Sequence, residues 1–466
     1  MAVKSFGVKE LNLIGSSGTP TLTSSSNLNL DATNVNVTGN LQVSGTVSWG
    51  SIPITIGNNA SETDNIMIGN SINSDADVGD RNVFVGRQAG NSAGSGASTN
   101  VALGYRAFEG GTGGFNIAIG RQSLNGGGGS YNVAIGDQLG VNAATGATKN
   151  VLIGYQSGLS LTTCDDVIAI GSNSLDTITE GRISGSGSNL NRYGHIAIGG
   201  YALQKFQGLN LDLGNMCTAV GYNALATNAQ GGSNTAFGGN ALRYLGNGQT
   251  DVTKTGSVGN TAVGHGAMQG GWSGSWDATN TFRGDYNTGI GWLALSNLKS
   301  GTADKNTAIG QMAGDNITTG SNNTCIGAGS DASSATVTNE ITLGDSNISS
   351  LRCNDTSISS LSDRRDKTDI VDLPAGLDFL NTLRPVKFKW QTRDGNGKDG
   401  LTRAGFIAQD LQSAQINHGY LDLVMDNNPD KLEAKQEHLI PVLVQAIKDL
   451  SAKNDALEAR IAALES

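Results

Sequence analysis

The centre of the chain repeats one short pattern of polar, apolar and small residues fifteen times, from "NIMIG" at 65–69 to "EITLG" at 340–344. In each copy a β-branched residue, a residue that is usually Ala, and a large apolar residue precede a glycine, and eleven copies begin with Asn. β-Branched residues favour extended backbone, and glycine permits a bend that a Cβ would obstruct. Each copy therefore predicts a short strand with one buried face, followed by a bend.

The residues after each glycine complete the predicted coil. Three residues beyond it, twelve of the fifteen copies place Ala or Ser, among them Ala89, Ala107, Ser123 and Ala313. We interpret this position as a second strand with a small inward residue, so that one repeat forms one coil of a parallel β-solenoid. Equivalent asparagines then stack about 4.8 Å apart and hydrogen-bond along a ladder. Longer repeats indicate loop insertions around 175–193, 204–215, 243–258 and 269–286.

A different pattern begins at Ser362. Residues 372–390 read as a helix and then a strand, with Pro385 at the break, and residues 403–414 read as a strand leading into a helix. From Leu439 the apolar residues follow a heptad, which predicts a coiled-coil helix. Its two seam positions hold Leu443, Leu450, Leu457 and Leu464, and Ile447, Asn454 and Ile461. Ile at one seam position with Leu at the other favours a dimer.

These patterns divide the chain into four segments. Residues 1–60 lack the repeat and contain strand-like alternation at 28–49, and by position we assign them to attachment and a stem. Residues 61–345 form a shaft, 346–361 a linker and 362–466 a small domain. The predicted fold is mainly β: a parallel β-roll or β-solenoid shaft, followed by a small α+β domain that ends in a coiled-coil helix.

Composition and charge narrow the function classes. The chain has 67 glycines, 5% aromatic and 15% charged residues, against about 25% charged in an average domain, which suits thin stacked coils. A net charge of −10 argues against nucleic acid as a partner. The cysteines and histidines show no ligand spacing, so we expect no metal or cofactor and read the cysteines as small apolar fillers. The sequence lacks a signal-peptide pattern and an apolar run of 18 residues, so we expect no membrane insertion.

Ser362 and Lys367 are the candidate catalytic residues. A serine hydroxyl becomes a nucleophile when a nearby base takes its proton, and a lysine serves as that base when desolvation lowers its pKa. The alternative is structural: Ser362 caps the next helical turn, with Asp363 and Asp366 favouring its amino end.

One predicted insertion is rich in aromatic residues. It contains Trp272, Trp276, Phe282 and Tyr286, which are candidates for stacking on the sugar rings of a receptor. The alternative is that these rings pack against a neighbouring coil or chain.

The repeats over residues 61–345 resemble the heads of YadA-like trimeric adhesins and the "NTAIG…A" repeats of phage tail fibres. That resemblance implies a left-handed β-roll in which three chains pack side by side. It also favours a trimer over the dimer that the heptad alone indicates.

Four C-terminal motifs occur in an order that resembles the endosialidase-type intramolecular chaperone. They are "LSDRRDKTDI" (361–370), "LRPVKFKW" (383–390), "AGFIAQDL" (404–411) and "LIPVLVQAIKDL" (439–450). The resemblance implies a domain that trimerises, aids assembly of the preceding β-structure and then cuts itself off. It implies Ser362 as nucleophile, Lys367 as base and Leu361–Ser362 as the bond cut.

The combined expectation is a phage tail fibre or receptor-binding protein. It would be a homotrimer in the virion, assembled in the host cytoplasm and attached to a tail or baseplate protein through residues 1–60. Its receptor would be a host cell-surface glycan or lipopolysaccharide, and its one enzymatic act a single-turnover serine autoproteolysis. The alternatives are a catalytic tailspike depolymerase, which requires paired carboxylates in a cleft, and a bacterial trimeric adhesin head.

Overall fold

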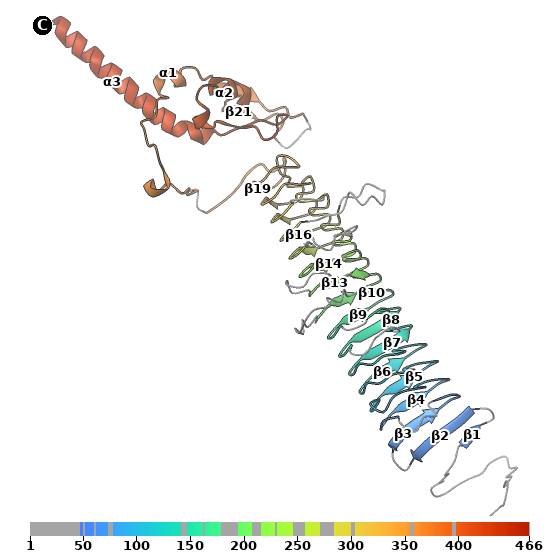
Figure 1. The fold of residues 1–466 in the computed structure, drawn as a ribbon. Coiled ribbons are helices and arrows are strands. Elements are labelled where there is room, and N and C mark those ends of the chain that lie inside the picture. Colours follow the sequence, from blue (N-terminus) through green and yellow to red (C-terminus); the bar gives the residue numbers. More distant parts are fainter. Residues whose placement is uncertain are drawn as a thin grey trace, which may run out of the picture.

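The computed structural model describes residues 47–49, 52–59, 62–72, 78–140, 147–161, 164–178, 194–206, 216–228, 231–245, 257–270, 284–299, 303–354, 358–393 and 398–465. These residues form a long shaft of stacked coils, a smaller domain beyond the last coil and a helix that ends the chain (Figure 1). The predicted fold, a mainly β parallel solenoid followed by a small α+β domain, is confirmed.

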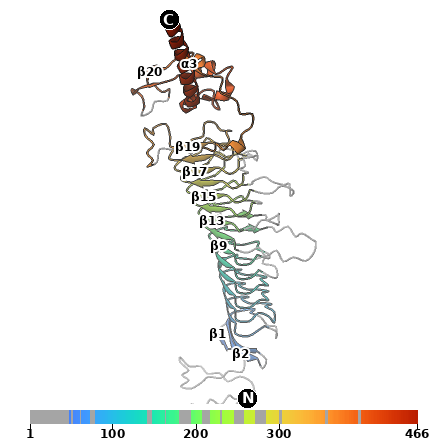
Figure 2. The same cartoon turned by 90° about the vertical axis from the view of Figure 1, so that its left-hand side faces the viewer.

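Each of the fifteen repeats contributes one strand to the shaft. These strands are β3 (Glu62–Ile68), β4 (Val83–Val85), β5 (Val101–Leu103), β6 (Ile117–Ile119), β7 (Val133–Asp137), β8 (Val151–Tyr155), β9 (Ile168–Ile170), β11 (Ile196–Ile198), β13 (Thr218–Val220), β14 (Thr235–Phe237), β15 (Thr261–Val263), β16 (Thr288–Ile290), β17 (Thr307–Ile309), β18 (Thr324–Ile326) and β19 (Ile341–Leu343). They pair in parallel and in register, with Ala102 opposite Ala118, for example. Figure 2 shows them as one continuous column along the shaft.

Shorter pairings flank this column. At the amino end, β1 (Val47–Trp49) and β2 (Ile52–Asn59) pair antiparallel with each other, and β2 pairs antiparallel with β3. Beside the shaft, β10 (Thr177–Ile178) and β12 (Lys205–Phe206) form a small parallel pair. All of residues 1–46 lie outside the described part of the chain. Most of each predicted insertion lies outside it too.

The middle residue of each strand faces the interior of the coil. Ala118 is fully buried, whereas its neighbour Ile117 is 39% exposed, because successive side chains of a strand point to opposite faces. The predicted buried face is therefore the face of the small residue. The β-branched residue before it, which is Thr in six coils, and the large apolar residue after it form two outward columns along the shaft.

The predicted second strand is wrong. Ala107 is buried as expected, but the residues after the motif glycine form a turn, and Arg106 has a φ of 56°. The left-handed backbone turns the chain sharply there, which an extended strand cannot do. The small residue is needed because the turn brings its side chain into the narrow interior.

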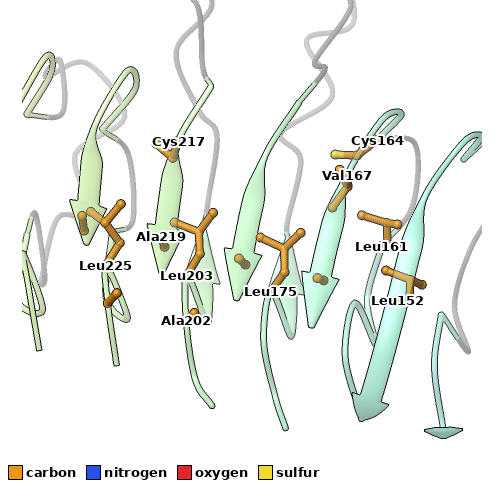
Figure 3. Packing of buried hydrophobic residues seen from close by; sticks show 14 of the residues in the cluster. Leu152, Leu161, Cys164, Val167, Leu175, Ala202, Leu203, Cys217, Ala219 and Leu225 are labelled. Atoms are coloured by element: carbon orange, nitrogen blue, oxygen red, sulfur yellow. The ribbon is translucent and has the colours of Figure 1, made fainter. Parts of the chain in front are cut away.

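Much of the core comes from a position that the sequence interpretation overlooked, four residues after the motif glycine. Leu175, Leu203 and Leu225 stand at this position, buried and with φ near 50°. Figure 3 shows these leucines stacked in line along the interior, beside small residues such as Ala219. Each coil is too thin for a core of its own, so the leucines bury one another from coil to coil.

The predicted asparagine ladder is confirmed. The side-chain oxygen of Asn100 accepts from the backbone N–H of Asn116 at 2.8 Å and from its Nδ2 at 3.1 Å, and the Nδ2 of Asn116 also donates to Gly129 at 3.0 Å. The ladder is interrupted where Val167, His195 and Cys217 take the Asn position. Each buried asparagine thus satisfies backbone groups of two coils that water does not reach.

The motif glycine is required by the distance between coils. Gly120 has a φ of 121°, and a Cβ there would lie 1.8 Å from the carbonyl oxygen of Gly136 in the next coil. Any other residue would force the coils apart.

The C-terminal domain packs around part of the terminal helix. Its elements are η2 (Arg364–Asp366), α1 (Leu377–Leu380), β20 (Val386–Lys389), β21 (Thr402–Gly405), α2 (Ala408–Ala414), η3 (Gly419–Leu421), β22 (Val424–Met425), β23 (Glu433–Ala434), η4 (Gln436–His438) and α3 (Leu439–Glu465). The predicted order of helix, strand, strand and helix is confirmed. Phe379, Leu411 and Val442 belong to a core that is separate from that of the shaft.

Two features relate this domain to its surroundings. The side chain of Asn428 donates to the backbone carbonyl of Ser333 in the last coils at 2.9 Å, so the domain contacts the end of the shaft. Helix α3 then extends away from the domain (Figure 1), and its seam residues Ile447, Leu450 and Leu464 are exposed in the single chain.

Candidate functional site

The structure brings the two candidate catalytic side chains together. The Nζ of Lys367 donates to the Oγ of Ser362 at 2.5 Å. Between the two residues the chain makes the single 3₁₀ turn η2, and the backbone N–H of Lys367 donates to the carbonyl of Arg364 at 3.2 Å. This turn returns Lys367 to the serine, so the spacing of five residues gives direct contact.

Asp363, not Ser362, caps this turn. The Oδ1 of Asp363 accepts from the backbone N–H of Arg365 at 2.8 Å. The side chain of Arg365 donates two hydrogen bonds to the same carboxylate, from Nε to Oδ1 at 3.1 Å and from Nη2 to Oδ2 at 2.7 Å. Hydrogen bonds from the Arg365 side chain, and then from its backbone, lower the pKa of Asp363. The structural alternative for Ser362, that it is the cap, is therefore wrong.

The site is open to solvent in the single chain. Ser362 and Lys367 are both exposed, and the side chain of Leu361 is 83% exposed. The Leu361–Ser362 peptide bond thus lies in an accessible segment between the shaft and the C-terminal domain.

The candidate receptor residues are only partly within the described chain. Trp272, Trp276 and Phe282 lie outside it. Tyr286 lies within it, with a side chain that is 57% exposed. Its ring lies over Gly259 of the preceding coil, where a Cβ would come within 2.7 Å of it.

Sequence interpretation missed a second aromatic feature on the shaft. Phe115 and Tyr131 stack in parallel, with ring centroids 4.9 Å apart and an interplanar angle of 3°. Both rings are more than half exposed. The signal was present in the sequence, because both residues directly precede the ladder asparagine in consecutive copies.

Two acidic side chains meet at the distal end of the shaft. Burial, followed by the negative charge of Asp315, raises the pKa of Asp331 to about 6. Burial also raises the pKa of Asp315. The ammonium of Lys431, from the C-terminal domain, acts on Asp331 in the opposite direction. The pair therefore titrates next to the junction of shaft and domain.

Metal binding and a membrane-spanning helix have little support among the described residues. Three or more His, Cys, Asp or Glu side chains do not gather there in an arrangement that could hold a metal ion. In the same part of the chain, each helix is too short or too polar to cross a membrane. Cys164, Cys217 and Cys325 are buried, as expected of small fillers, but Cys353 is exposed and that interpretation is wrong for it. Cys217 is also not simply apolar, because its Sγ donates to the carbonyl of Gly231 at 3.3 Å.

Comparison with known proteins identifies one related family. Residues 362–420 match the family described as chaperone of endosialidase. The match begins at Ser362 and ends before α3. No curated protein and no solved structure matches the chain. The β-solenoid shaft together with this C-terminal match fits a tail-fibre-like protein.

Proposed function

We propose that the protein is a trimeric phage tail fibre whose C-terminal domain, residues 362–466, guides assembly and then cleaves the chain between Leu361 and Ser362. The observation that carries this proposal is the 2.5 Å contact of Lys367 Nζ with Ser362 Oγ, at the residue where the family match begins. Self-cleavage needs no bound substrate, because nucleophile and scissile bond belong to one chain.

The reaction starts when the amine of Lys367 takes the proton of Ser362 Oγ. The oxygen attacks the carbonyl carbon of Leu361, the peptide C–N bond breaks, and the proton passes to the leaving nitrogen of Ser362. The product is an ester between the Leu361 acyl group and Ser362 Oγ. The amine of Ser362 is free from this step on. Water then hydrolyses the ester, which restores the hydroxyl of Ser362 and leaves a carboxylate on Leu361.

Assembly completes the site in this proposal. Lysine amines act as bases when they are removed from water, and both members of the pair are exposed in one chain. The exposed seam of α3 and the outward column of large apolar residues along the shaft offer faces for two further copies. Packing of these copies would cover the Ser362–Lys367 pair, so cleavage would follow correct assembly.

The remaining parts of the proposal concern the virion. Residues 1–60 attach the fibre to a tail or baseplate protein, and the shaft contacts a host glycan or lipopolysaccharide through Trp272, Trp276, Phe282 and Tyr286. The exposed ring of Tyr286 supports this receptor role, since amphipathic rings stack on sugars. The fibre would assemble in the host cytoplasm and act in the virion. The carboxyl groups of Asp315 and Asp331 share a hydrogen bond, so they lack the separation of about 5–10 Å that a depolymerase needs. Among the described residues, no other observation favours a depolymerase or an adhesin head.

Intact mass spectrometry tests the cleavage. The wild-type chain should yield fragments 1–361 and 362–466, whereas Ser362→Ala and Lys367→Met should stay intact. Ser360→Ala, which removes a hydroxyl two residues upstream, is the matched control and should cleave as the wild type does. A wild-type chain that stays whole as an assembled trimer would remove the proposed dyad.

A further inference from the structure

We propose that Asp363 is the positioning residue of the self-cleavage site, because its carboxylate holds the turn that places Lys367 against Ser362. This inference rests on the proposed self-cleavage and adds a residue to it. Asp363 touches neither reacting atom in the structure. Its effect is on the backbone between them.

The need for such a residue follows from the chain geometry. Five residues of extended chain span roughly 16 Å, whereas Lys367 Nζ lies 2.5 Å from Ser362 Oγ. The reversal depends on the three residues of η2. Isolated helical turns of this length are marginal, since nucleation orders several residues for one hydrogen bond. The turn must therefore be stabilised by something other than its own backbone.

Asp363 supplies that stabilisation through both oxygens of its carboxylate and through its backbone carbonyl. Its Oδ1 caps the N–H of Arg365 at 2.8 Å, and its carbonyl accepts from the N–H of Asp366 at 3.2 Å. The guanidinium of Arg365 binds both carboxylate oxygens and fixes the rotamer of Asp363. A turn held in this way brings Lys367 Nζ to Ser362 Oγ.

The cap contributes more to this positioning than the ion pair does. The side chain of Arg365 is 89% exposed, and exposed ion pairs contribute little because water and salt screen them. A cap, in contrast, satisfies a backbone donor that otherwise has no partner within the turn. An uncharged side chain with an oxygen at the same place should therefore replace the carboxylate.

The test compares three variants of the full chain with the wild type. Asp363→Ala removes cap and charge, Asp363→Asn keeps a cap oxygen without the charge, and Asp366→Ala removes a carboxyl group from the same turn. The fraction of cleaved chain is followed over time by intact mass spectrometry, over a range of pH. The trimer mass of each variant is checked by light scattering.

We expect Asp363→Ala to cleave about fivefold more slowly, the factor that corresponds to the loss of a typical cap. Asp363→Asn should remain within about twofold of the wild type, as expected where a screened ion pair contributes little. The control Asp366→Ala should match the wild type. The pH at which the rate is half-maximal should stay the same in all variants, because a positioning residue leaves the titrating group unchanged.

Several outcomes would overturn the inference. Asp363→Ala trimers that cleave at the wild-type rate would show that the cap is dispensable. Asp363→Asn trimers as slow as Asp363→Ala, or a shifted pH profile, would show that the charge acts on the reaction itself. A wild-type trimer that never cleaves removes the proposed self-cleavage, and the inference falls with it.

Discussion

Phe84 and Gly90 occupy complementary space within one coil of the shaft: a Cβ on Gly90 would lie 2.3 Å from the Phe84 ring. In the next coil the sizes are exchanged, with Ala102 at the strand position and Phe108 four residues after the glycine, both buried. The coil of Leu152 and Gly158 repeats the first arrangement, since a Cβ on Gly158 would lie 2.8 Å from the Leu152 side chain. In these coils a large residue at one of the two positions is therefore matched by a small residue at the other.

This complementarity predicts the effect of Gly90→Ala. The variant should lower the unfolding temperature of the shaft, because the methyl group meets Phe84 and the backbone φ is +60°. Overpacking of this kind costs about 1–3 kcal/mol. Gly110→Ala is the matched control, since its φ is +68° but its closest neighbour would lie 3.8 Å away.

Differential scanning calorimetry separates the cost of the steric contact with Phe84 from the cost of the positive backbone φ. Gly110→Ala should show only the backbone cost, and Gly90→Ala a larger loss. The double variant Phe84→Ala/Gly90→Leu should recover stability relative to Phe84→Ala, because it copies the pairing of Ala118 with Leu124. Equal losses in the two glycine variants would contradict the packing account.

The asparagine ladder predicts a strong effect of Asn116→Val. The change removes the acceptor of the Asn132 backbone N–H and the donor to Gly129, at distances of 2.9 and 3.0 Å. Each buried polar group without a partner costs about 1–3 kcal/mol. The free energy of unfolding, measured in guanidinium chloride, should fall well below that of the half-buried control Asn91→Val. A loss no larger than the control's would mean that the ladder adds little stability.

The raised pKa of Asp331, about 6, predicts that this residue makes stability depend on pH. Between its ordinary value of 3.8 and about 6, the folded chain holds a proton that the unfolded chain has lost. The contribution to stability is thus complete below pH 3.8 and is lost as the pH rises through about 6. For a half-exposed group, solvent screening limits the effect to on the order of 1 kcal/mol.

Asp331→Asn removes the titration and tests it. Its unfolding temperature should exceed that of the wild type at pH 7.5 and approach it at pH 4. A constant difference across this range would show that the gain is unrelated to ionisation.

The exposed seam of α3 predicts that Leu450→Lys prevents trimer formation. Leu450 occupies a seam position and is exposed in the single chain, so copies that pack there must bury a charge in its place. Light scattering should report monomers, and the proposed self-cleavage should fall with the loss of assembly. Ala452→Lys adds the same charge on the opposite face of the helix and should leave the trimer intact. Trimers of Leu450→Lys would place the interface elsewhere.

The sequence predicted the regular parts of the fold because they depend on local rules. The motif glycine is required by the close approach of coils, and the ladder asparagine satisfies backbone groups of its own coil and of the next. The turn at Ala107 was mistaken for a strand, because alternation of small and large residues fits both conformations. Leu124 was overlooked, since its left-handed φ of 50° opposes the usual preference of leucine and arises only from packing between coils.

The candidate site was predictable to a similar extent. The spacing of Ser362 and Lys367 within "SDRRDK" suggested the pair, and the structure brings their side chains together. Asp363 caps the turn rather than Ser362, because the backbone angles at the start of the turn determine which side chain reaches the free N–H. The faces that meet other copies depend on contacts that a single chain does not contain.

The final residue of the ladder has a consequence for the length of the fibre. Most coils begin with an asparagine that offers its oxygen to the next coil. The last begins with Glu340, whose two carboxylate oxygens accept from the backbone N–H and the hydroxyl of Ser333 at 2.6 and 2.5 Å. A second shaft that approached this end would meet a negative charge whose oxygens are already engaged. Parallel strands stacked without limit are the basis of amyloid growth. Glu340 thus gives a stack of parallel strands, built like a fibril, a defined terminus at β19.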